Sequence, residues 1–415
     1  MQGFQYSNGL LHAESVSLVE LDKRYGTPCY VYSKVAIESQ WQSYDQAFGD
    51  RSHLICYAVK ANGNLGILNL LARMGSGFDI VSVGELHRVI KAGGDPSKIV
   101  FSGVGKRPDE IKAALECSVK CLNIESRSEL HLINTIAGEI GKVAPISIRV
   151  NPDVDPITHP YISTGLKDNK FGIAYEDAEA IFIEARGLAN IEIVGIDCHI
   201  GSQITNLEPY HDALSRILHL IQKLIAVDIN ICHIDIGGGL GIRYNDEQPP
   251  LPSEFVKLIC NMIKDETIEI LIEPGRSIVG NAGLLLCRVL YIKKLPNKNF
   301  AIVDAAMNDL IRPVLYDAWQ DILSVREESA AQQDEYDIVG PICESGDILG
   351  LNRMLSINEG DLLAISGVGA YCFSMSSNYN ARPRAAELLV DGQDTHEIRR
   401  RESIEDLYQG EEILP

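Results

Sequence analysis

The sequence predicts an α/β protein: a closed (β/α)8 barrel followed by a smaller, mostly antiparallel β domain. Three observations favour this fold class. Strand-like and helix-like segments alternate from about residue 53, eight such strands fit into a little more than 200 residues, and the alternation stops near residue 283. The chain has 415 residues and 46% hydrophobic content, which is enough for two cores. A doubly wound open sheet would show a similar pattern and stays an alternative at this point.

Eight short runs rich in β-branched and other apolar residues supply the strands of the predicted barrel. They lie at residues 53–59, 78–82, 98–102, 121–124, 145–150, 192–200, 231–237 and 267–273. Segments with helical spacing of apolar residues lie between them, for example 84–93 after the second strand and 126–140 after the fourth. Because each strand is followed by such a crossover, we expect the strands to run parallel.

The pattern changes at about residue 283, where turns and short helical pieces replace the long crossovers. Further strand-like runs lie at 283–295, 299–304, 336–340, 361–366 and 385–392. This spacing is typical of a mostly antiparallel β domain, and the early run 28–33 is expected to pair with it. We therefore predict an N-terminal segment at 1–34, a barrel at 35–282 and a C-terminal β domain at 283–415.

Charge and cysteine usage narrow the class of protein. The 37 basic and 57 acidic residues give a net charge of −20, which argues against nucleic-acid or membrane partners. No secretory leader or membrane-spanning run is evident, so we expect a cytoplasmic protein. The ten cysteines lack CxxC spacing. We expect reduced thiols that pack as small hydrophobes, such as Cys56, Cys232 and Cys287, and no metal site.

Lys60 directly follows the first barrel strand. Its amine is therefore expected at the C-terminal mouth of the barrel, where the active sites of this architecture are assembled. Apolar neighbours favour the uncharged amine, which is a nucleophile. A lone lysine at a strand end is more commonly an exposed residue, so the other strand ends must decide between the two interpretations.

The sixth and seventh strands end in residues that suit a flat ring and a phosphate. His199 and Ser202 follow the sixth strand, and a glycine run that includes Gly238 and Gly239 follows the seventh. Backbone N–H groups of glycine can approach a phosphate closely because no Cβ is in the way. Taken singly, a rim histidine, a turn serine and a tight glycine turn explain these residues equally well.

The eighth strand ends in Glu273, Pro274, Gly275 and Arg276. Alone, the acid and the base would be a surface ion pair worth at most ~1 kcal/mol. Together, however, the four strand ends offer an amine, an imidazole ring, a phosphate-binding turn with an arginine, and a carboxylate. Pyridoxal 5'-phosphate requires this set, namely a lysine, a partner for its ring nitrogen and phosphate donors.

Five motifs in this order resemble those of the fold-type III pyridoxal-phosphate decarboxylases, a family with members that act on diaminopimelate, ornithine and arginine. The motifs are YAVKAN at 57–62, FDIVSVGEL at 78–86, CHIGSQ at 198–203, GGGLG at 237–241 and EPGR at 273–276. The resemblance covers nearly the whole chain. It implies the barrel fold, the pyridoxal-phosphate cofactor and a decarboxylation.

The resemblance also implies a role for each residue at the barrel rim. Lys60 would hold the cofactor covalently, His199 would stack on its ring, and Glu273 would pair with the ring nitrogen and keep it protonated. The remaining cofactor contacts there, mostly to the phosphate, would come from Ser202, Gly238, Gly239, Pro274, Gly275 and Arg276. Arg276 would also lie near the substrate.

The C-terminal half resembles the diaminopimelate branch of that family. The motif GPICESGDIL at 340–349 has a glutamate after the cysteine, where the ornithine branch has an aspartate. By this resemblance, Cys343 would donate a proton to the substrate carbon and Glu344 would bind substrate. The segments 151–173 and 370–390 also resemble that branch.

The implied substrate is meso-diaminopimelate, which carries a second amino-acid head at its far end. Arg312 and Tyr316 would bind the distal carboxylate and Glu344 the distal ammonium, and Tyr371 would lie beside both cofactor and substrate. Loss of CO2 from the D-configured carbon would give L-lysine. In this family Cys343 and Glu344 reach the cofactor of the neighbouring subunit, so the resemblance also implies a homodimer.

Other functions stay open on the same scaffold. A decarboxylase for another basic amino acid or for carboxynorspermidine is one, although the motif at 340–349 argues against it. A non-catalytic regulatory relative is another, although the intact Lys60, Glu273 and Cys343 argue against it. An alanine racemase is disfavoured because its ring nitrogen faces an arginine, whereas Glu273 stands here.

Overall fold

The computed structural model describes residues 2–155, 170–327 and 333–415. The chain divides into two compact units. The barrel unit comprises residues 41–242 and 248–277, and the β unit comprises residues 1–40, 243–247 and 278–415.

The barrel unit contains eight parallel strands that close on themselves. They are β5 (His53–Ala58), β6 (Gly77–Ile80), β7 (Ile99–Phe101), β8 (Cys121–Ile124), β9 (Ala144–Asn151), β11 (Ile191–Asp197), β12 (His233–Asp235) and β13 (Glu269–Ile272). The sheet closes because β13 pairs with β5 and β8 pairs with β9. The prediction of a closed barrel is therefore confirmed, and the open doubly wound sheet is excluded. A short extra strand, β10 (Ile173–Ala174), pairs with β9.

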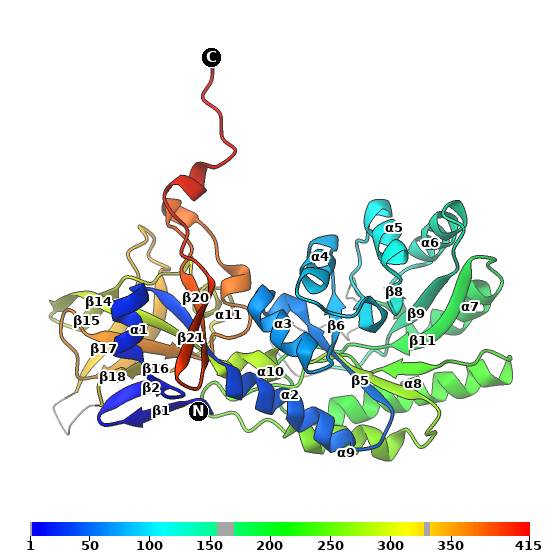
Figure 1. Cartoon of the computed structure of the whole chain (residues 1–415). Helices are drawn as coiled ribbons and strands as arrows, with labels where there is room; N and C mark the ends of the chain where they lie inside the picture. The colour runs from blue at the N-terminus through cyan, green and yellow to red at the C-terminus, as the bar shows by residue number, and fades with distance from the viewer. Residues whose placement is uncertain (1, 156–169, 328–332) are drawn as a thin grey trace. The chain divides into compact units, whose positions relative to one another are not determined.

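Helices follow the barrel strands and lie outside them (Figure 1). They are α3 (Leu65–Arg73), α4 (Val83–Lys91), α5 (Pro108–Cys117), α6 (Arg127–Glu139), α7 (Tyr175–Arg186), α8 (Glu208–Ala226), α9 (Pro252–Met262) and α10 (Arg276–Val279), while α2 (Lys34–Phe48) precedes β5. Local sequence explains their bounds. In α4, for example, the Ser82 hydroxyl accepts from Glu85 N–H and satisfies an N-terminal donor, while Leu86 and Val89 form the buried face.

The β unit is built on a large mixed sheet in which most strand pairs are antiparallel. Its strands are β4 (Cys29–Ser33), β14 (Gly283–Leu295), β15 (Lys298–Val303), β16 (Ile322–Ser324), β17 (Asp334–Val339), β18 (Ile348–Leu355), β19 (Leu362–Ser366), β20 (Ala386–Asp391) and β21 (Asp394–Arg399). Only the pairs β15–β17 and β4–β20 are parallel among the described strands of this sheet. The early strand β4 lies between β14 and β20, so the N-terminal residues complete the C-terminal sheet.

Smaller elements complete the β unit. A three-stranded sheet near the N-terminus consists of β1 (Phe4–Ser7), β2 (Leu10–Ala13) and β3 (Val16–Ser17), and it is followed by α1 (Leu18–Tyr25). The sequence did not indicate this sheet, because its strands are only two to four residues long. Leu11, Leu18, Val31 and Leu284 share one buried apolar cluster, which joins this small sheet and α1 to the main sheet.

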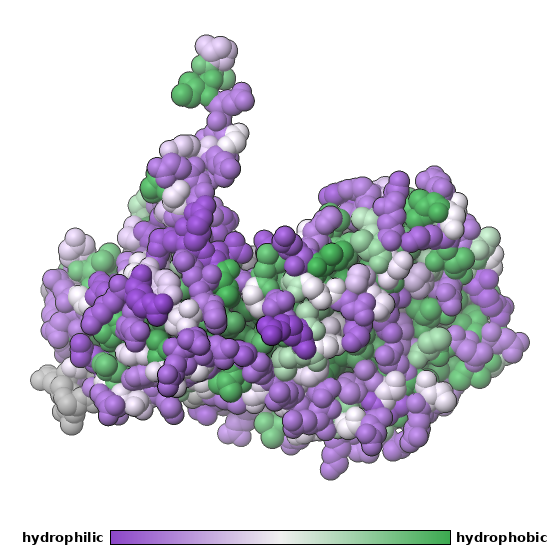
Figure 2. All heavy atoms as spheres, in the orientation of Figure 1, coloured by the Kyte–Doolittle hydropathy of each residue, from purple (hydrophilic) through white to green (hydrophobic). Residues whose placement is uncertain are grey.

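The surface of the molecule and the state of its cysteines can be compared with what the composition indicated. Hydrophilic residues are spread over the visible face of both units (Figure 2). Among the described residues, no helix is long and apolar enough to cross a membrane. All ten cysteines are free thiols. Cys56 and Cys287 are buried as predicted, but Cys232 is exposed because it precedes β12 instead of lying within it.

Candidate active site

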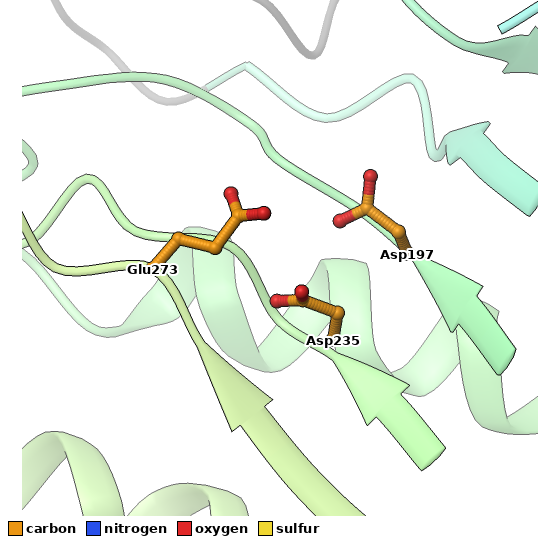
Figure 3. Close-up of side chains that lie close together, drawn as sticks. All are labelled: Asp197, Asp235 and Glu273. Atoms are coloured by element: carbon orange, nitrogen blue, oxygen red, sulfur yellow. The ribbon is translucent and has the colours of Figure 1, made fainter. Parts of the chain in front are cut away.

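Three carboxylates meet at the carboxyl ends of adjacent barrel strands. Asp197 ends β11, Asp235 ends β12, and Glu273 directly follows β13. The three are buried, each offers an oxygen within 4.8 Å of the others, and they point toward one another (Figure 3). Burial raises the pKa of Asp235 to about 7, and burial and the neighbouring acids raise the pKa of Glu273 well above its usual value. Each acid therefore disfavours the ionised form of its neighbours.

Arg149 supplies positive charge from the neighbouring strand β9. Its guanidinium lies 3.2 Å from Glu125 Oε1 and 3.7 Å from Asp197 Oδ2, and all three side chains are at most 9% exposed. Burial lowers the pKa of Arg149, but Glu125 and Asp197 more than compensate and the pKa is raised overall. Arg149 is therefore a fixed cation beside the cluster.

Lys60 lies in the 3-10 turn Val59–Ala61 that follows β5, at the same end of the barrel, as predicted for a strand-end lysine. Its Nζ is 2.6 Å from Oδ2 of Asp79, which is fully buried in β6. The lysine side chain is 37% exposed, so the amine lies at the boundary between the carboxylate and the open rim. The sequence indicated apolar neighbours that favour the uncharged amine, but the structure places a buried carboxylate beside Nζ instead.

His199 follows β11 and its ring is tied to the glycine turn. Its Nδ1 accepts from Gly238 N–H at 3.1 Å, which leaves the proton of the neutral ring on Nε2. Burial, together with Arg149 and Lys60, lowers the pKa of His199 well below its usual value. The imidazole is therefore neutral at physiological pH, as a stacking surface should be.

Glycine is required in the turns that follow the seventh and eighth barrel strands, because other backbone segments lie very close to them. A Cβ at Gly238 would lie 2.1 Å from Glu273 O, and one at Gly239, where φ is +97°, would lie 2.2 Å from Gly201 O. At Gly275 a Cβ would lie 2.9 Å from Ala61 Cβ. Larger residues would push these backbone segments apart. Because glycine has no Cβ, the N–H groups of these turns can come close to a bound anion.

Arg276 is buried at the start of α10, and its Nη2 donates to Ser202 Oγ at 3.1 Å. The interpretation of Arg276 as part of a surface ion pair does not describe this geometry. The guanidinium and the hydroxyl come from the eighth and the sixth strand ends, on either side of the glycine turn. They form a cationic donor pair of the kind that binds phosphate.

The predicted substrate residues lie in the β unit, on loops and on a short helix. Cys343 and Glu344 are exposed in the loop between β17 and β18. Buried Asp347 fixes this loop, because its Oδ2 accepts from Ile342 N–H at 2.8 Å and its Oδ1 accepts from Met307 N–H at 2.6 Å. The cysteine and the glutamate are thus presented by a rigid turn.

Arg312 and Tyr316 begin and end α11 (Arg312–Tyr316). Arg312 is buried, and its guanidinium lies 4.5 Å from the centre of the Tyr244 ring. When the Gln320 amide is turned so that its oxygen faces Arg312, this oxygen accepts a hydrogen bond from Arg312 Nη1 at 2.6 Å. Tyr371 has a φ of +59°, an uncommon value for a bulky residue that is often found at functional sites.

Sequence reasoning missed several buried charges, among them Asp79, Arg149, Asp197 and Asp235. The signal was present, because each interrupts an apolar strand at or near its carboxyl end. A single charge inside such a run leaves the strand pattern intact, so only the residues that follow the strands stand out as candidates. Part of the 151–173 segment, residues 156–169, lies outside the described residues.

The rim fits pyridoxal phosphate on the evidence of this structure. Asp197 Oδ1 and Asp235 Oδ2 are buried and have no hydrogen-bond partner among the described residues. A cationic ring nitrogen at Glu273 would add positive charge beside these acids. The glycine turn, with Ser202 and Arg276, would hold the phosphate, and Lys60 would provide the amine.

Comparison with known proteins identifies relatives along the whole chain. The family model described as "Pyridoxal-dependent decarboxylase, pyridoxal binding domain" matches residues 34–280. A diaminopimelate decarboxylase of Pseudomonas aeruginosa is 57% identical over 415 residues, which is 100% of both proteins.

Two solved structures extend the likeness to the fold. A diaminopimelate decarboxylase from Helicobacter pylori, complexed with L-lysine, has a TM-score of 0.91 at 44% identity and covers 95% of this chain and 98% of that one. The diaminopimelate decarboxylase from M. jannaschii, also in complex with L-lysine, has a TM-score of 0.95 at 38% identity and covers 100% and 98%.

Proposed function

The chain belongs to the family of pyridoxal-dependent decarboxylases, and from this premise we infer that it converts meso-diaminopimelate to L-lysine and CO2, the last step of lysine biosynthesis. The full-length likeness to diaminopimelate decarboxylases supports this substrate. The observation that carries the chemistry is the set of strand ends at the barrel rim. An amine, a neutral imidazole, a buried acid and a glycine turn with an arginine occupy one face of the barrel unit.

When bound, pyridoxal phosphate supplies a sink for the electron pair that remains on the substrate carbon as CO2 leaves. Lys60 would hold the cofactor through its amine, and Asp79 Oδ2 lies 2.6 Å from that amine. Glu273, as a carboxylate, would pair with the ring nitrogen and keep it protonated. His199 would offer a neutral imidazole as a stacking surface for the ring.

The residues of the β unit complete the reaction. Cys343 delivers a proton from Sγ to the substrate carbon, so the bond to the departing carboxylate is replaced by a C–H bond, and solvent restores the thiol proton. Arg312 and Tyr316 bind the distal carboxylate, and Glu344 binds the distal ammonium. Tyr371 lies beside cofactor and substrate. A site built for this charged head rejects substrates that lack it, because its polar groups would stay unpaired.

We further propose a homodimer in which Cys343 and Glu344 of one copy act at the barrel rim of the other. The exposure of both side chains supports this role, because a proton donor at the domain surface is accessible to a partner. A two-fold dimer would then contain two equivalent sites. Sedimentation equilibrium should give twice the mass of 45.6 kDa, and a monomer with full activity would contradict the proposal.

The cytoplasm is the proposed location. The ten free cysteines support it, because exposed thiols such as Cys232 persist in a reducing compartment. Fractionation of cells that produce the protein should place it with cytoplasmic markers. Recovery in an exported fraction would contradict this.

The proposed function is tested by CO2 release with added pyridoxal phosphate. The substrates to compare are meso-diaminopimelate, ornithine, arginine and carboxynorspermidine, with the amine product identified by chromatography. Lysine formed from diaminopimelate alone is the expected result. Turnover of another substrate would leave the role of Lys60 intact but overturn the roles of Glu344, Arg312 and Tyr316. A colourless protein that takes up no cofactor would indicate a non-catalytic relative.

A further inference from the structure

The loop at residues 376–382 of the β unit contacts both Cys343 and Glu344. Tyr379 Oη donates to Glu344 Oε2 at 2.9 Å. Asn380 Oδ1 lies 3.4 Å from Cys343 Sγ and accepts from Cys343 N–H at 3.5 Å. Two adjacent residues of one loop therefore hold the two adjacent residues to which we assign proton donation and substrate binding.

We propose that Asn380 and Tyr379 are positioning residues for the decarboxylation: Asn380 orients the Cys343 thiol for proton delivery, and Tyr379 orients the Glu344 carboxylate toward the distal ammonium of the substrate. This inference rests on the proposed roles of Cys343 and Glu344. Neither positioning residue needs to touch the substrate, because each acts through the residue that it contacts.

The two loops are anchored to neighbouring residues of the same segment. Ser377 N–H donates to Asn308 O at 3.0 Å, and Arg382 Nε donates to Asn308 Oδ1 at 3.1 Å. Asn308 is 3% exposed, so this anchor is buried. The loop that carries Cys343 is held by Met307, the residue before Asn308, whose N–H donates to Asp347. The common anchor sets the distance between the loops and so preserves the contacts of Asn380 and Tyr379.

The backbone of the loop is held in an unfavourable conformation at the contact. Asn380 has a φ of +56° and Ala381 a φ of +52°, so two consecutive residues other than glycine lie in the left-handed region. Such conformations persist where the surroundings fix them, and they cluster at functional sites. Tyr379 and Asn380 are themselves exposed, so their hydrogen bonds add little to stability. Function is the better explanation for the strain.

The chemistry of each contact suits its proposed task. The Asn380 amide oxygen faces Cys343 N–H, which fixes the oxygen, not the NH2 group, toward the thiol. An acceptor at this position directs the S–H bond of the thiol. Tyr379 donates to one oxygen of Glu344 and leaves the other oxygen for an ammonium group.

The first test is Tyr379→Phe, which removes only the hydroxyl. In the holoenzyme we expect KM for meso-diaminopimelate to rise about 10-fold, because a hydrogen bond to a charged group is lost, while kcat stays within about 2-fold. Tyr291→Phe is the matched control, because Tyr291 is 65% exposed on β14. It should change neither constant.

The second test uses two substitutions that tolerate a positive φ. Asn380→Gly removes the acceptor and should lower kcat about 10-fold at unchanged cofactor absorbance. Asn380→Asp keeps an acceptor but adds a negative charge beside the thiol. The pH profile for alkylation of Cys343 by iodoacetamide, followed by peptide mass spectrometry, should therefore shift to higher pH. Asn352→Gly is the control, because Asn352 is exposed with a φ of +54°.

The outcomes separate this inference from the proposed function. If the wild-type enzyme makes lysine while the variants keep its kcat, its KM and its alkylation profile, the positioning roles are wrong. If the wild-type enzyme makes no lysine, the proposed function fails. A shifted alkylation profile in Asn380→Asp would still support the contact with Cys343 in that case. Equal melting temperatures would exclude general unfolding as the cause of any change.

Discussion

At the barrel rim three acids of the site are buried and crowded, whereas in the β unit Cys343 and Glu344 are exposed on a loop. Asp197, Asp235 and Glu273 offer oxygens within 4.8 Å of one another at adjacent strand ends. Cys343 and Glu344 lie on the surface of a turn that Asp347 fixes. The first arrangement shifts pKa values strongly, and the second leaves side chains accessible to a partner and a substrate.

The difference suggests separate tasks: cofactor binding at the barrel rim, and substrate selection and protonation in the β unit. A buried acidic cluster is suited to holding a cationic ring nitrogen, because low dielectric strengthens the interaction. An exposed cysteine and an exposed glutamate are suited to selecting and protonating a substrate. Changes at the rim should therefore affect the cofactor, and changes in the β unit should affect turnover and specificity while the cofactor stays bound.

The largest effect is expected for Lys60→Ala. Activity and the visible absorbance of the bound cofactor should both be lost, because no other amine is proposed to hold it. Absorbance spectra after borohydride reduction check this, and Lys257→Ala on the exposed face of α9 is the control. A reducible adduct that persists on another lysine would refute the assignment.

Cys343→Ala tests the role of the exposed thiol in the β unit. We expect kcat to fall about 100-fold or more, the range for a lost general acid, while cofactor binding changes little. Cys232→Ala, which also removes an exposed thiol, should have no effect. Unchanged turnover in Cys343→Ala would remove this thiol from the mechanism.

Arg312→Ala should raise KM for meso-diaminopimelate about 10- to 100-fold, because a charge-assisted contact to the distal carboxylate is lost. Steady-state kinetics measures this, with Arg73→Ala at an exposed position of α3 as the control. An unaltered KM and rate would mean that the distal head is bound elsewhere.

The smallest effect concerns the pH dependence of stability. Burial raises the pKa of Asp235 from 3.8 to about 7 in the folded chain, so the unfolded chain loses this proton first as pH rises. Its contribution to stability is complete below about pH 4 and is lost as pH rises through 7. Asp235→Asn should therefore flatten the fall in melting temperature of the cofactor-free protein over this range, by on the order of 2 °C. Asp50→Asn, at an exposed position, should leave the slope unchanged.

Much of the fold could be predicted because barrel strands are short apolar runs with clear helical crossovers. The rim residues Lys60, His199 and Glu273 followed from their positions at strand ends. The buried charges Asp79 and Asp235 did not, because a single carboxylate inside an apolar run shows its partners only when distant strands are brought together. Likewise, the contacts of Tyr379 and Asn380 join loops that are more than 30 residues apart in the sequence.

Activity in mixed dimers tests most clearly whether the barrel rim of one copy acts with Cys343 of the other. Lys60→Ala and Cys343→Ala chains, each expected to be nearly inactive alone, would be dissociated, mixed in equal amounts and reassociated. If the rim of one copy works with Cys343 of the other, each mixed dimer has one intact site, and random pairing restores about a quarter of the wild-type activity. Activity no higher than that of the two parent variants, with mixed dimers shown to form, would contradict this and place both residues in the site of one chain.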